Sequence, residues 1–166
     1  GGLSMNLIVA VDQNWGIGYQ GQLLCHLPGD LQRFKKLTCG KTVVMGRATL
    51  ASLPQGQPLP QRRNIVLSRA RQTAVADYQL IDSLEQLLTE LARYPSEEIF
   101  VIGGASIYEQ LLPYCRRAYI TRLQGIFPAD RHLPDFDHLP NWQLREASAQ
   151  LCHEGLRYQY LLYENS

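Results

Sequence analysis

Short runs of β-favouring residues mark the strands of a central sheet. They cover residues 7–11, 42–45, 63–67, 78–81 and 98–102. The run at 7–11 is continuously apolar rather than alternating, which is typical of a strand buried on both faces, and the runs at 42–45 and 98–102 are likewise interpreted as buried strands. Two of them lead directly into glycine, at Gly46 and at Gly103, and each glycine precedes a segment with a helical pattern. This arrangement predicts strand–turn–helix units.

Helical spacing of apolar residues separates these strands. The pattern predicts helices over about 29–39, 46–52, 84–94 and 105–112. In the first helix Leu31, Phe34 and Leu37 share one face, and Gly40 follows its end. Ser83 with Gln86 forms a capping-box pattern at the start of the third. The stretch 12–24 is rich in Gly and Gln and is long for a connection, so we expect a functional loop there.

The last third of the chain predicts strands without helices, over 118–127, 142–149 and 156–163, with a Pro- and Asp-rich loop at 128–141. Strands that first alternate with helices and later stand alone indicate an α/β fold. We therefore expect a single domain with a mixed, mainly parallel central sheet of about eight strands, flanked by helices and carrying an antiparallel strand at its C-terminal edge.

Composition excludes several classes of protein. The chain has 166 residues, 45% of them hydrophobic and 19% charged, with a net charge of +1, which suits one ordinary globular domain. Nearly balanced charge argues against a general nucleic-acid surface, and no apolar run is long enough for a bilayer span. Residues 1–4 precede an internal Met5 and are interpreted as an expression scar, which leaves 5–166 as the domain.

The cysteines and histidines predict no metal site. Four cysteines are scattered without a CxxC pair, which indicates free thiols in a reducing cytoplasm, and the four histidines lack metal-ligand spacing. Nothing in the sequence requires more than a monomer.

Asp30 is the most informative polar residue. Its spacing from Leu27, Leu31, Phe34 and Leu37 puts a carboxylate on the apolar face of the first helix. One interpretation is that it merely complements the helix dipole in the first turn. The other is a carboxylate at the bottom of an apolar pocket, paired with a flat cationic or amidine-like ring.

Two glycine turns are candidates for binding phosphate. Gly46-Arg47-Ala48-Thr49 and Ile102-Gly103-Gly104-Ala105-Ser106 each follow a buried strand and open a helix, where free N–H groups can face an anion. Either turn alone is equally typical of an ordinary βα corner. The chain lacks a GxGxxG fingerprint, so an ordinary Rossmann site is not predicted. Arginines at 62, 63 and 69 flank one strand, where arginines are usually solvated.

These blocks together resemble the dihydrofolate reductase family, and the likeness extends from Met5 to Glu164. The blocks that carry it, in order, are 7–10, 16–18, 27–31 with 34–35, 44–47 with Thr49, 58–60 with 62–64, 101–104 with 107–108, and 119–121. The resemblance implies an NADPH-dependent reductase that transfers a hydride to the pterin ring of dihydrofolate and that antifolates bind.

The resemblance also implies the residues of the substrate site. Asp30 would hold the pterin ring and promote its protonation, with Thr121 as its partner, and Arg62 would take the glutamyl carboxylate. The implied substrate site consists of Ile8, Val9, Asp30, Leu31, Phe34, Leu53, Leu59, Arg62, Ile102, Tyr108 and Thr121.

For the cofactor, the resemblance implies that Arg47, Ser68 and Arg69 meet the 2′-phosphate, which would select NADPH over NADH. The implied cofactor site consists of Ala10, Ile17, Gly46, Arg47, Ala48, Thr49, Leu67, Ser68, Arg69, Ile102, Gly103, Gly104, Ala105, Ser106, Ile107 and Tyr108. It further implies a cis peptide bond between Gly103 and Gly104.

The chain departs from the family pattern near the expected pocket. Cys25 stands where tryptophan is usual and Leu24 where proline is usual, while Ser106 and Ala129 replace a basic residue and a glycine of relatives. Two alternatives therefore stay open. One is a related NADPH-dependent pterin or pyrimidine reductase, against which Asp30 argues. The other is a protein that binds NADPH or folate without turning it over.

Overall fold

The alternation of apolar side chains along each strand builds a sheet with two buried faces. In the computed structural model, which describes residues 2–24, 27–69 and 77–166, Leu7 packs with one core cluster and Ile8 with the other. Val44 and Val43 divide in the same way between the two clusters. Because successive side chains of a strand point to opposite faces, a strand that is apolar throughout serves both layers.

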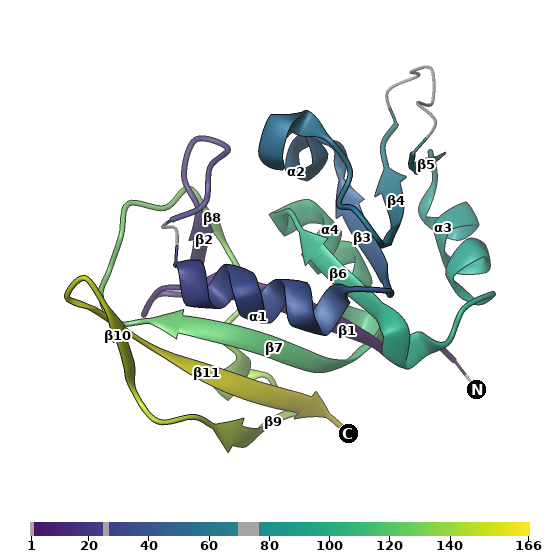
Figure 1. Ribbon diagram of the computed structural model, residues 1–166. Coiled ribbons are helices and arrows are strands. Elements are labelled where there is room, and N and C mark those ends of the chain that lie inside the picture. Colours follow the sequence, from purple (N-terminus) through teal and green to yellow (C-terminus); the bar gives the residue numbers. More distant parts are fainter. Residues whose placement is uncertain (1, 25–26, 70–76) are drawn as a thin grey trace.

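The strands form one large sheet in the order β10-β11-β7-β1-β6-β3-β4-β5, with β9 also paired to β11 (Figure 1). Their bounds are β1 Met5–Val11, β3 Thr42–Gly46, β4 Arg63–Leu67, β5 Gln79–Ile81, β6 Ile99–Gly103, β7 Cys115–Leu123, β9 Trp142–Ala147, β10 Leu151–His153 and β11 Leu156–Asn165. Pairing is parallel from β7 through β1, β6, β3 and β4 to β5. It is antiparallel where β11 meets β7, β9 and β10. The predicted mixed sheet with an antiparallel C-terminal edge is confirmed.

Four helices within the described residues cover this sheet. They are α1 Pro28–Thr38, α2 Arg47–Ser52, α3 Leu84–Leu91 and α4 Ala105–Leu111. Figure 1 shows α1 in front of the sheet and α4 behind it. Phe34 and Leu37 of α1 pack on the face that Ile8 serves, whereas Leu87 of α3 and Leu111 of α4 pack on the face that Leu7 serves.

Several element boundaries differ from the predicted ones. The helix expected to reach Tyr94 ends at Leu91, although Ser83 caps its start by accepting a hydrogen bond from the Gln86 N–H as predicted. The strand expected over 118–127 is β7, which begins and ends earlier because its register follows β1 from Met5 to Val11. The hairpin strand β10 was missed. It pairs with β11 through a turn in which Glu154 and Gly155 both have positive φ.

The two loops predicted at 12–24 and 128–141 contain a small sheet of their own. Within them, β2 Gly16–Gly18 pairs antiparallel with β8 Arg131–His132. Each partner is too short to stand out in the sequence, and they form strands only because the fold brings them together. The 3₁₀ turn Phe136–His138 lies in the second loop, where no helix was expected.

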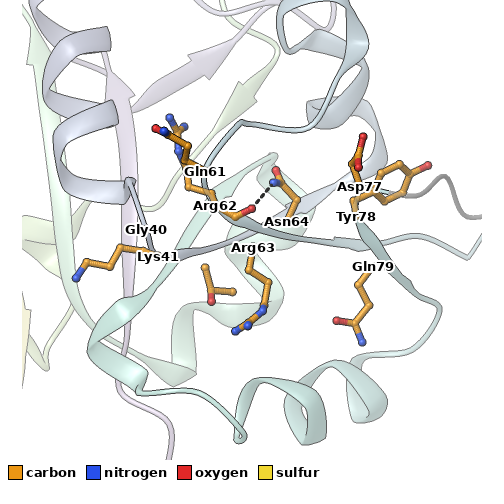
Figure 2. Close-up of a pocket in the computed structure, with 10 residues that line it drawn as sticks. Gly40, Lys41, Gln61, Arg62, Arg63, Asn64, Asp77, Tyr78 and Gln79 are labelled. Carbon is orange, nitrogen blue, oxygen red and sulfur yellow. Dashed lines mark hydrogen bonds between the residues drawn. The ribbon is translucent and has the colours of Figure 1, made fainter.

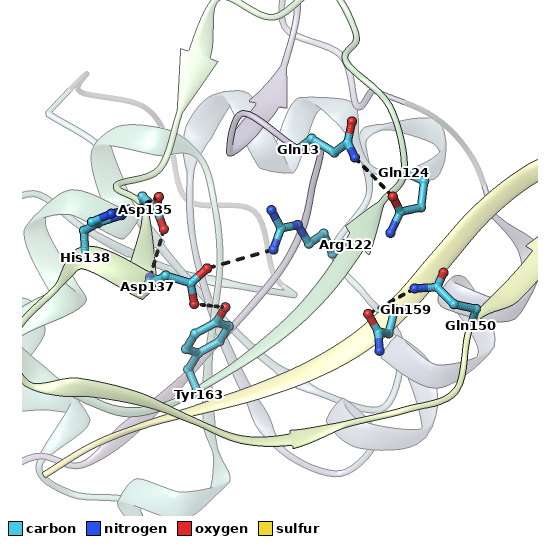
Figure 3. A network of polar contacts seen from close by, with 9 residues as sticks. All are labelled: Gln13, Arg122, Gln124, Asp135, Asp137, His138, Gln150, Gln159 and Tyr163. Atoms are coloured by element: carbon cyan, nitrogen blue, oxygen red, sulfur yellow. Dashed lines mark hydrogen bonds and ion pairs between the residues drawn. The ribbon is translucent and has the colours of Figure 1, made fainter.

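Aromatic packing anchors the first of these loops to the core. Trp15 is buried and stacks on Phe136 with 5.4 Å between ring centroids, and its centroid lies 6.0 Å from that of Tyr163. The Tyr163 hydroxyl donates to the Asp137 carboxylate at 2.8 Å, and Arg122 approaches the same carboxylate at 4.0 Å (Figure 3). The start of the loop 12–24 is therefore held against the core through the ring of Trp15.

The described cysteines Cys39, Cys115 and Cys152 are free thiols. Within the described parts of the chain, no helix is long and apolar enough to cross a membrane.

Candidate active site

The carboxylate of Asp30 joins helix α1 to the middle of the sheet. Asp30 lies in the first turn of α1, which has no side-chain cap. The buried Thr121, on β7, donates its hydroxyl to Asp30 Oδ1 at 2.6 Å. Thr121 pairs in register with Ala10 of β1, so the contact lies over the centre of the sheet. The side chain of Asp30 is thus tied to β7 and does more than complement the dipole of its own helix.

Burial changes the proton affinity of this carboxyl. Desolvation raises the pKa of Asp30 above its ordinary value, because removing a carboxyl from water disfavours its charged form. The hydrogen bond from Thr121 and the positive charge of Arg33 act in the opposite direction. The burial effect is the largest, so Asp30 keeps its proton at higher pH than a solvated aspartate.

Apolar side chains predicted for the substrate site gather beside Asp30. Phe34 of α1, Leu53 and Leu59 lie in the same cluster as Ile8 and Ile102. Tyr108 belongs to the cluster on the other face of the sheet, and two further predicted residues also stand apart. The side chain of Leu31 is 53% exposed, and that of Val9 packs on the opposite face of the sheet, so only the backbone of Val9 faces the site.

Consecutive arginines at the start of β4 point in different directions (Figure 2). The Arg62 guanidinium carbon lies 5.9 Å from the ring centroid of Phe34, toward the cluster around Asp30. The Arg62 Nε is buried and has no hydrogen-bond partner within the described parts of the chain. Arg63 instead stacks on Tyr94, with 4.0 Å between its guanidinium carbon and the ring centroid. Of these two arginines, Arg62 is the one that lies beside a residue of the predicted substrate site.

Asn64 holds the loop that carries Leu59 and Arg62, a role the sequence analysis missed. Its side-chain oxygen accepts from the Leu59 N–H at 3.0 Å, and its amide donates to the carbonyls of Leu59 and Arg62 at 2.9 and 3.1 Å. A hollow of about 590 Å³ adjoins this loop at the amino-terminal ends of β3, β4 and β5 (Figure 2). Its position is at the opposite end of these strands from the glycine turns.

The two predicted glycine turns converge at the carboxyl ends of β3 and β6, which are neighbours in the sheet. Gly103 has a φ of +125°, and a Cβ on it would lie 3.3 Å from Thr49 Oγ1 and 3.4 Å from the Tyr108 hydroxyl oxygen. A Cβ on Gly46 would lie 3.0 Å from Ile107 Cγ1. The peptide bond between Gly103 and Gly104 is cis, as expected. Glycine at these positions lets Ile107, Thr49 and Tyr108 pack closely against the backbone of the two turns.

The other residues predicted for the cofactor lie around the same edge. Gly46 pairs with Leu67, so Arg47 and Arg69, both exposed, follow adjacent strands. Ser68 is buried between these arginine-bearing ends. Tyr108 donates its hydroxyl to the Ile8 carbonyl at 2.8 Å, which links α4 to β1. Ala48 and Ser106 are exposed, Ala10 and Ala105 are partly buried, and Ile17 and Ile107 are buried.

Two acidic residues hold the loop 12–24 in place. Asp12 is buried and accepts from the N–H groups of Asn14, Gly16 and Phe127 at 2.8 to 2.9 Å. Asp130 accepts from the Gln20 N–H at 2.9 Å. The role of Asp12 was missed in the sequence analysis. An aspartate at a strand end before a Gly-containing turn was its only signal in the sequence.

Leu24 and Cys25, which depart from the family pattern, shortly precede helix α1 in the sequence. Leu24 is partly buried beside Leu27 and Tyr158. Cys25, the most notable departure from the family pattern, lies outside the described residues. Arg33 and Tyr160, which lie close to Asp30, were both missed. The spacing of three residues between Asp30 and Arg33 on one helix was a usable signal for Arg33, whereas nothing in the sequence relates Tyr160 to Asp30.

Together these features define an α/β protein in which a partly buried acid is bonded to the sheet and two glycine turns stand at the carboxyl ends of neighbouring strands. The family model "Dihydrofolate reductase" matches residues 4–165. The chain belongs to the dihydrofolate reductase family and is therefore an NADPH-dependent oxidoreductase of folate metabolism.

Individual relatives agree with this assignment. A dihydrofolate reductase of Bacillus subtilis is 41% identical over 162 residues, which cover 96% of this chain and 94% of the relative. One from Staphylococcus aureus is 34% identical over 142 residues, covering 86% and 84%. A solved dihydrofolate reductase from Enterococcus faecalis, complexed with NADP(H) and RAB-propyl, has a TM-score of 0.83 and 30% identity, covering 98% of this chain and 96% of its own.

Proposed function

We propose that this chain reduces 7,8-dihydrofolate to tetrahydrofolate with NADPH, and that Asp30 is its catalytic carboxyl. The observation that carries the proposal is the bond between Asp30 and Thr121 within an apolar cluster. Asp30 is the acid that α1 directs to the centre of the sheet. A carboxylate in such a place can make paired hydrogen bonds to the amidine-like edge of a pterin ring.

The residues at the two glycine turns fit a dinucleotide. Thr49 places its hydroxyl beside Gly103, where a Cβ would lie 3.3 Å from Thr49 Oγ1, and both turns stand at the carboxyl ends of neighbouring strands. Thr49 and the turn from Gly103 to Ser106 would hold the bridging phosphates, using hydroxyl and backbone N–H groups. When bound, NADPH supplies the hydride, and the protein supplies position and electrostatics.

The protein's own contribution to the chemistry is the control of a proton. A carboxyl whose pKa burial raises can hold a proton near the pterin ring nitrogen or promote its delivery from water. Thr121 keeps the carboxyl oriented, because its hydroxyl occupies one of the two carboxyl oxygens. The other oxygen, Oδ2, is then the one directed at a ligand.

The ligands carry two anionic groups that arginines would bind, the glutamyl carboxylate of the substrate and the 2′-phosphate of the cofactor. Arg62 would bind the glutamyl carboxylate of the substrate, since its buried Nε lacks a partner within the described residues. Arg47 and Arg69, together with Ser68, would bind the 2′-phosphate that distinguishes NADPH from NADH. Support comes from their positions after adjacent strands β3 and β4.

The deciding assay follows the absorbance of NADPH after dihydrofolate is added to the purified protein. The parent chain should consume NADPH, and Asp30→Asn should retain NADPH binding while losing most of its turnover at neutral pH. NADPH binding without consumption in the parent would favour a binding protein. Consumption only with another pterin or a pyrimidine would favour the related reductase. A near-parental rate in Asp30→Asn from pH 6 to 9 would remove Asp30 from the catalytic role.

We also propose a cytoplasmic, monomeric protein that binds antifolates. The three described thiols are all free, which suits a reducing compartment. Light scattering on the purified protein measures its mass in solution, and a dimeric mass would contradict the monomer.

A further inference from the structure

The side chain of Arg33 is held beside Asp30 by two aromatic rings, and it has no role in the reaction proposed above. It follows Asp30 by one turn of α1, and its side chain is partly buried. Its guanidinium carbon lies 4.0 Å from the ring centroid of Tyr160 and 5.8 Å from that of Tyr119. A cation held over an aromatic face at this distance is attracted by the ring, and the planar guanidinium suits such stacking.

Strand pairing explains why this stack and the carboxyl lie together. Thr121, which bonds Asp30, is the cross-strand partner of Tyr160 in the β7–β11 pair. Tyr119 precedes Thr121 by two residues and therefore points to the same face of β7. The cross-strand pair Thr121 and Tyr160 therefore contacts two side chains of α1. Thr121 donates a hydrogen bond to Asp30, and the ring of Tyr160 stacks with Arg33.

Arg33 acts on Asp30 as a nearby charge rather than as a bonded partner. Within the described parts of the chain, no carboxylate lies within 4.0 Å of the Arg33 guanidinium. The charge of Arg33 nevertheless lowers the pKa of Asp30, and the charge of Asp30 raises that of Arg33 against the effect of burial. An attraction of this kind is weakly screened when both groups are partly buried.

Within the described residues, the other groups near Asp30 are hydroxyls and aromatic rings. On β7 these are the hydroxyl of Thr121 and, on the same face, the ring of Tyr119. On β11 the neighbour is Tyr160, whose ring meets that of Tyr158 edge to face. Burial raises the pKa of Tyr160 to about 12, so this phenol stays neutral. Arg33 is therefore the charged neighbour of Asp30 within the described residues.

We propose that Arg33, seated on the ring of Tyr160, is a positioning residue that keeps a fixed positive charge beside Asp30 and so sets the pH at which this carboxyl releases its proton. The inference rests on the proposed function for its link to turnover, because only a catalytic Asp30 would transmit the effect to the reaction. The effect on the carboxyl itself is measurable without turnover.

The test is a carbon-13 NMR titration of the Asp30 carboxyl, whose signal is assigned by its absence in Asp30→Asn. Arg33→Gln and Arg33→Met both remove the charge and keep a side chain that can lie on Tyr160. In each, the titration midpoint of Asp30 should move to higher pH. Lys36→Gln is the matched control, since it removes one positive charge from the exposed side of the same helix. Its Asp30 midpoint should equal that of the parent.

Two further variants separate the effect of the positive charge from that of the stacking on Tyr160. Arg33→Lys keeps a charge on a mobile ammonium group without the planar stack, so its midpoint should lie between those of the parent and Arg33→Gln. Tyr160→Phe keeps the ring face and removes only a neutral hydroxyl, so its midpoint should stay near that of the parent. A midpoint in both neutral Arg33 variants that matches the parent would overturn the inference, as would an equal shift in Lys36→Gln.

A pH profile of single-turnover NADPH oxidation then separates the effect of Arg33 on Asp30 from the catalytic role of Asp30. If the rate profile moves in step with the Asp30 midpoint, both the inference and the catalytic role of Asp30 are supported. If the Asp30 midpoint moves and the rate profile does not, Arg33 controls the carboxyl as inferred, and the proposed catalytic role of Asp30 is wrong.

Discussion

Replacing Asp12 by asparagine should destabilise this protein far more than its position in a loop suggests. The Asp12 side chain is buried, and its residue is 1% exposed. Its Oδ1 accepts from the N–H groups of Asn14 and Gly16 at 2.9 and 2.8 Å, and its Oδ2 accepts from the Phe127 N–H at 2.9 Å. One carboxylate thus joins the end of β1 to the segment before β8.

Asparagine has the same shape but only one acceptor oxygen. If that oxygen keeps the two bonds of Oδ1, each changes from a charged to a neutral hydrogen bond, a loss of about 1 kcal/mol apiece. The amide nitrogen then faces the Phe127 N–H, which loses its partner at a cost of about 1–3 kcal/mol. The sum, on the order of 3–5 kcal/mol, is a large part of the roughly 5–15 kcal/mol that stabilises a typical domain.

Urea unfolding followed by circular dichroism measures this loss, with the slope m compared to show that the unfolding transition is otherwise unchanged. Asp130→Asn is the control, because Asp130 is exposed and its carboxylate accepts one bond from the Gln20 N–H. It should cost less than about 1 kcal/mol. If Asp12→Asn were as mild as this control, the buried carboxylate would not be what holds the two loops together.

Three further outcomes follow from the site and its anchors. The pKa of Asp30 is raised in the folded state, so the parent loses stability as pH rises from the ordinary value of 3.8 through the raised one. Asp30→Asn should therefore be more stable than the parent near pH 7, with a difference that vanishes toward pH 3.8, and a pH-independent difference in urea unfolding would contradict this. Arg47→Ala should narrow the preference for NADPH over NADH by about tenfold in binding titrations, as expected for one charge-assisted contact, whereas equal losses would move the 2′-phosphate contact to Arg69. Trp15→Ala should cost about 3–5 kcal/mol of unfolding free energy, because Trp15 is buried against Phe136, and a loss below about 1 kcal/mol would show that this ring is not an anchor of the loop.

The sequence was sufficient for the sheet, most of its helices and the location of the acid. Continuous apolar runs such as 43–45 and 65–67 are satisfied by burial on both faces of the sheet, and the structure buries them so. Asp30 stood out because a helix that points a carboxylate into its apolar face needs a compensating partner. These are properties of a few adjacent residues, which a local pattern records completely.

Only the tertiary structure decided which polar groups meet. Arg62 and Arg63 are equivalent in sequence, and their division between the cluster around Phe34 and the ring of Tyr94 depends on the alternation of β4 within a packed sheet. The bond between Asp30 and Thr121 spans 91 positions of the chain.

The same holds for the strands β2 and β8, for the three bonds of Asp12 and for the seat of Arg33 on Tyr160. The strands β2 and β8 and the loop after Asp12 have no periodic pattern of their own, and the pattern that predicts α1 does not indicate which residue of the sheet Arg33 contacts. A hydrogen bond or a ring contact reaches only a few ångströms, so it depends on where two distant parts of the chain are brought together by the packing of everything between them, and that information is not local to either partner.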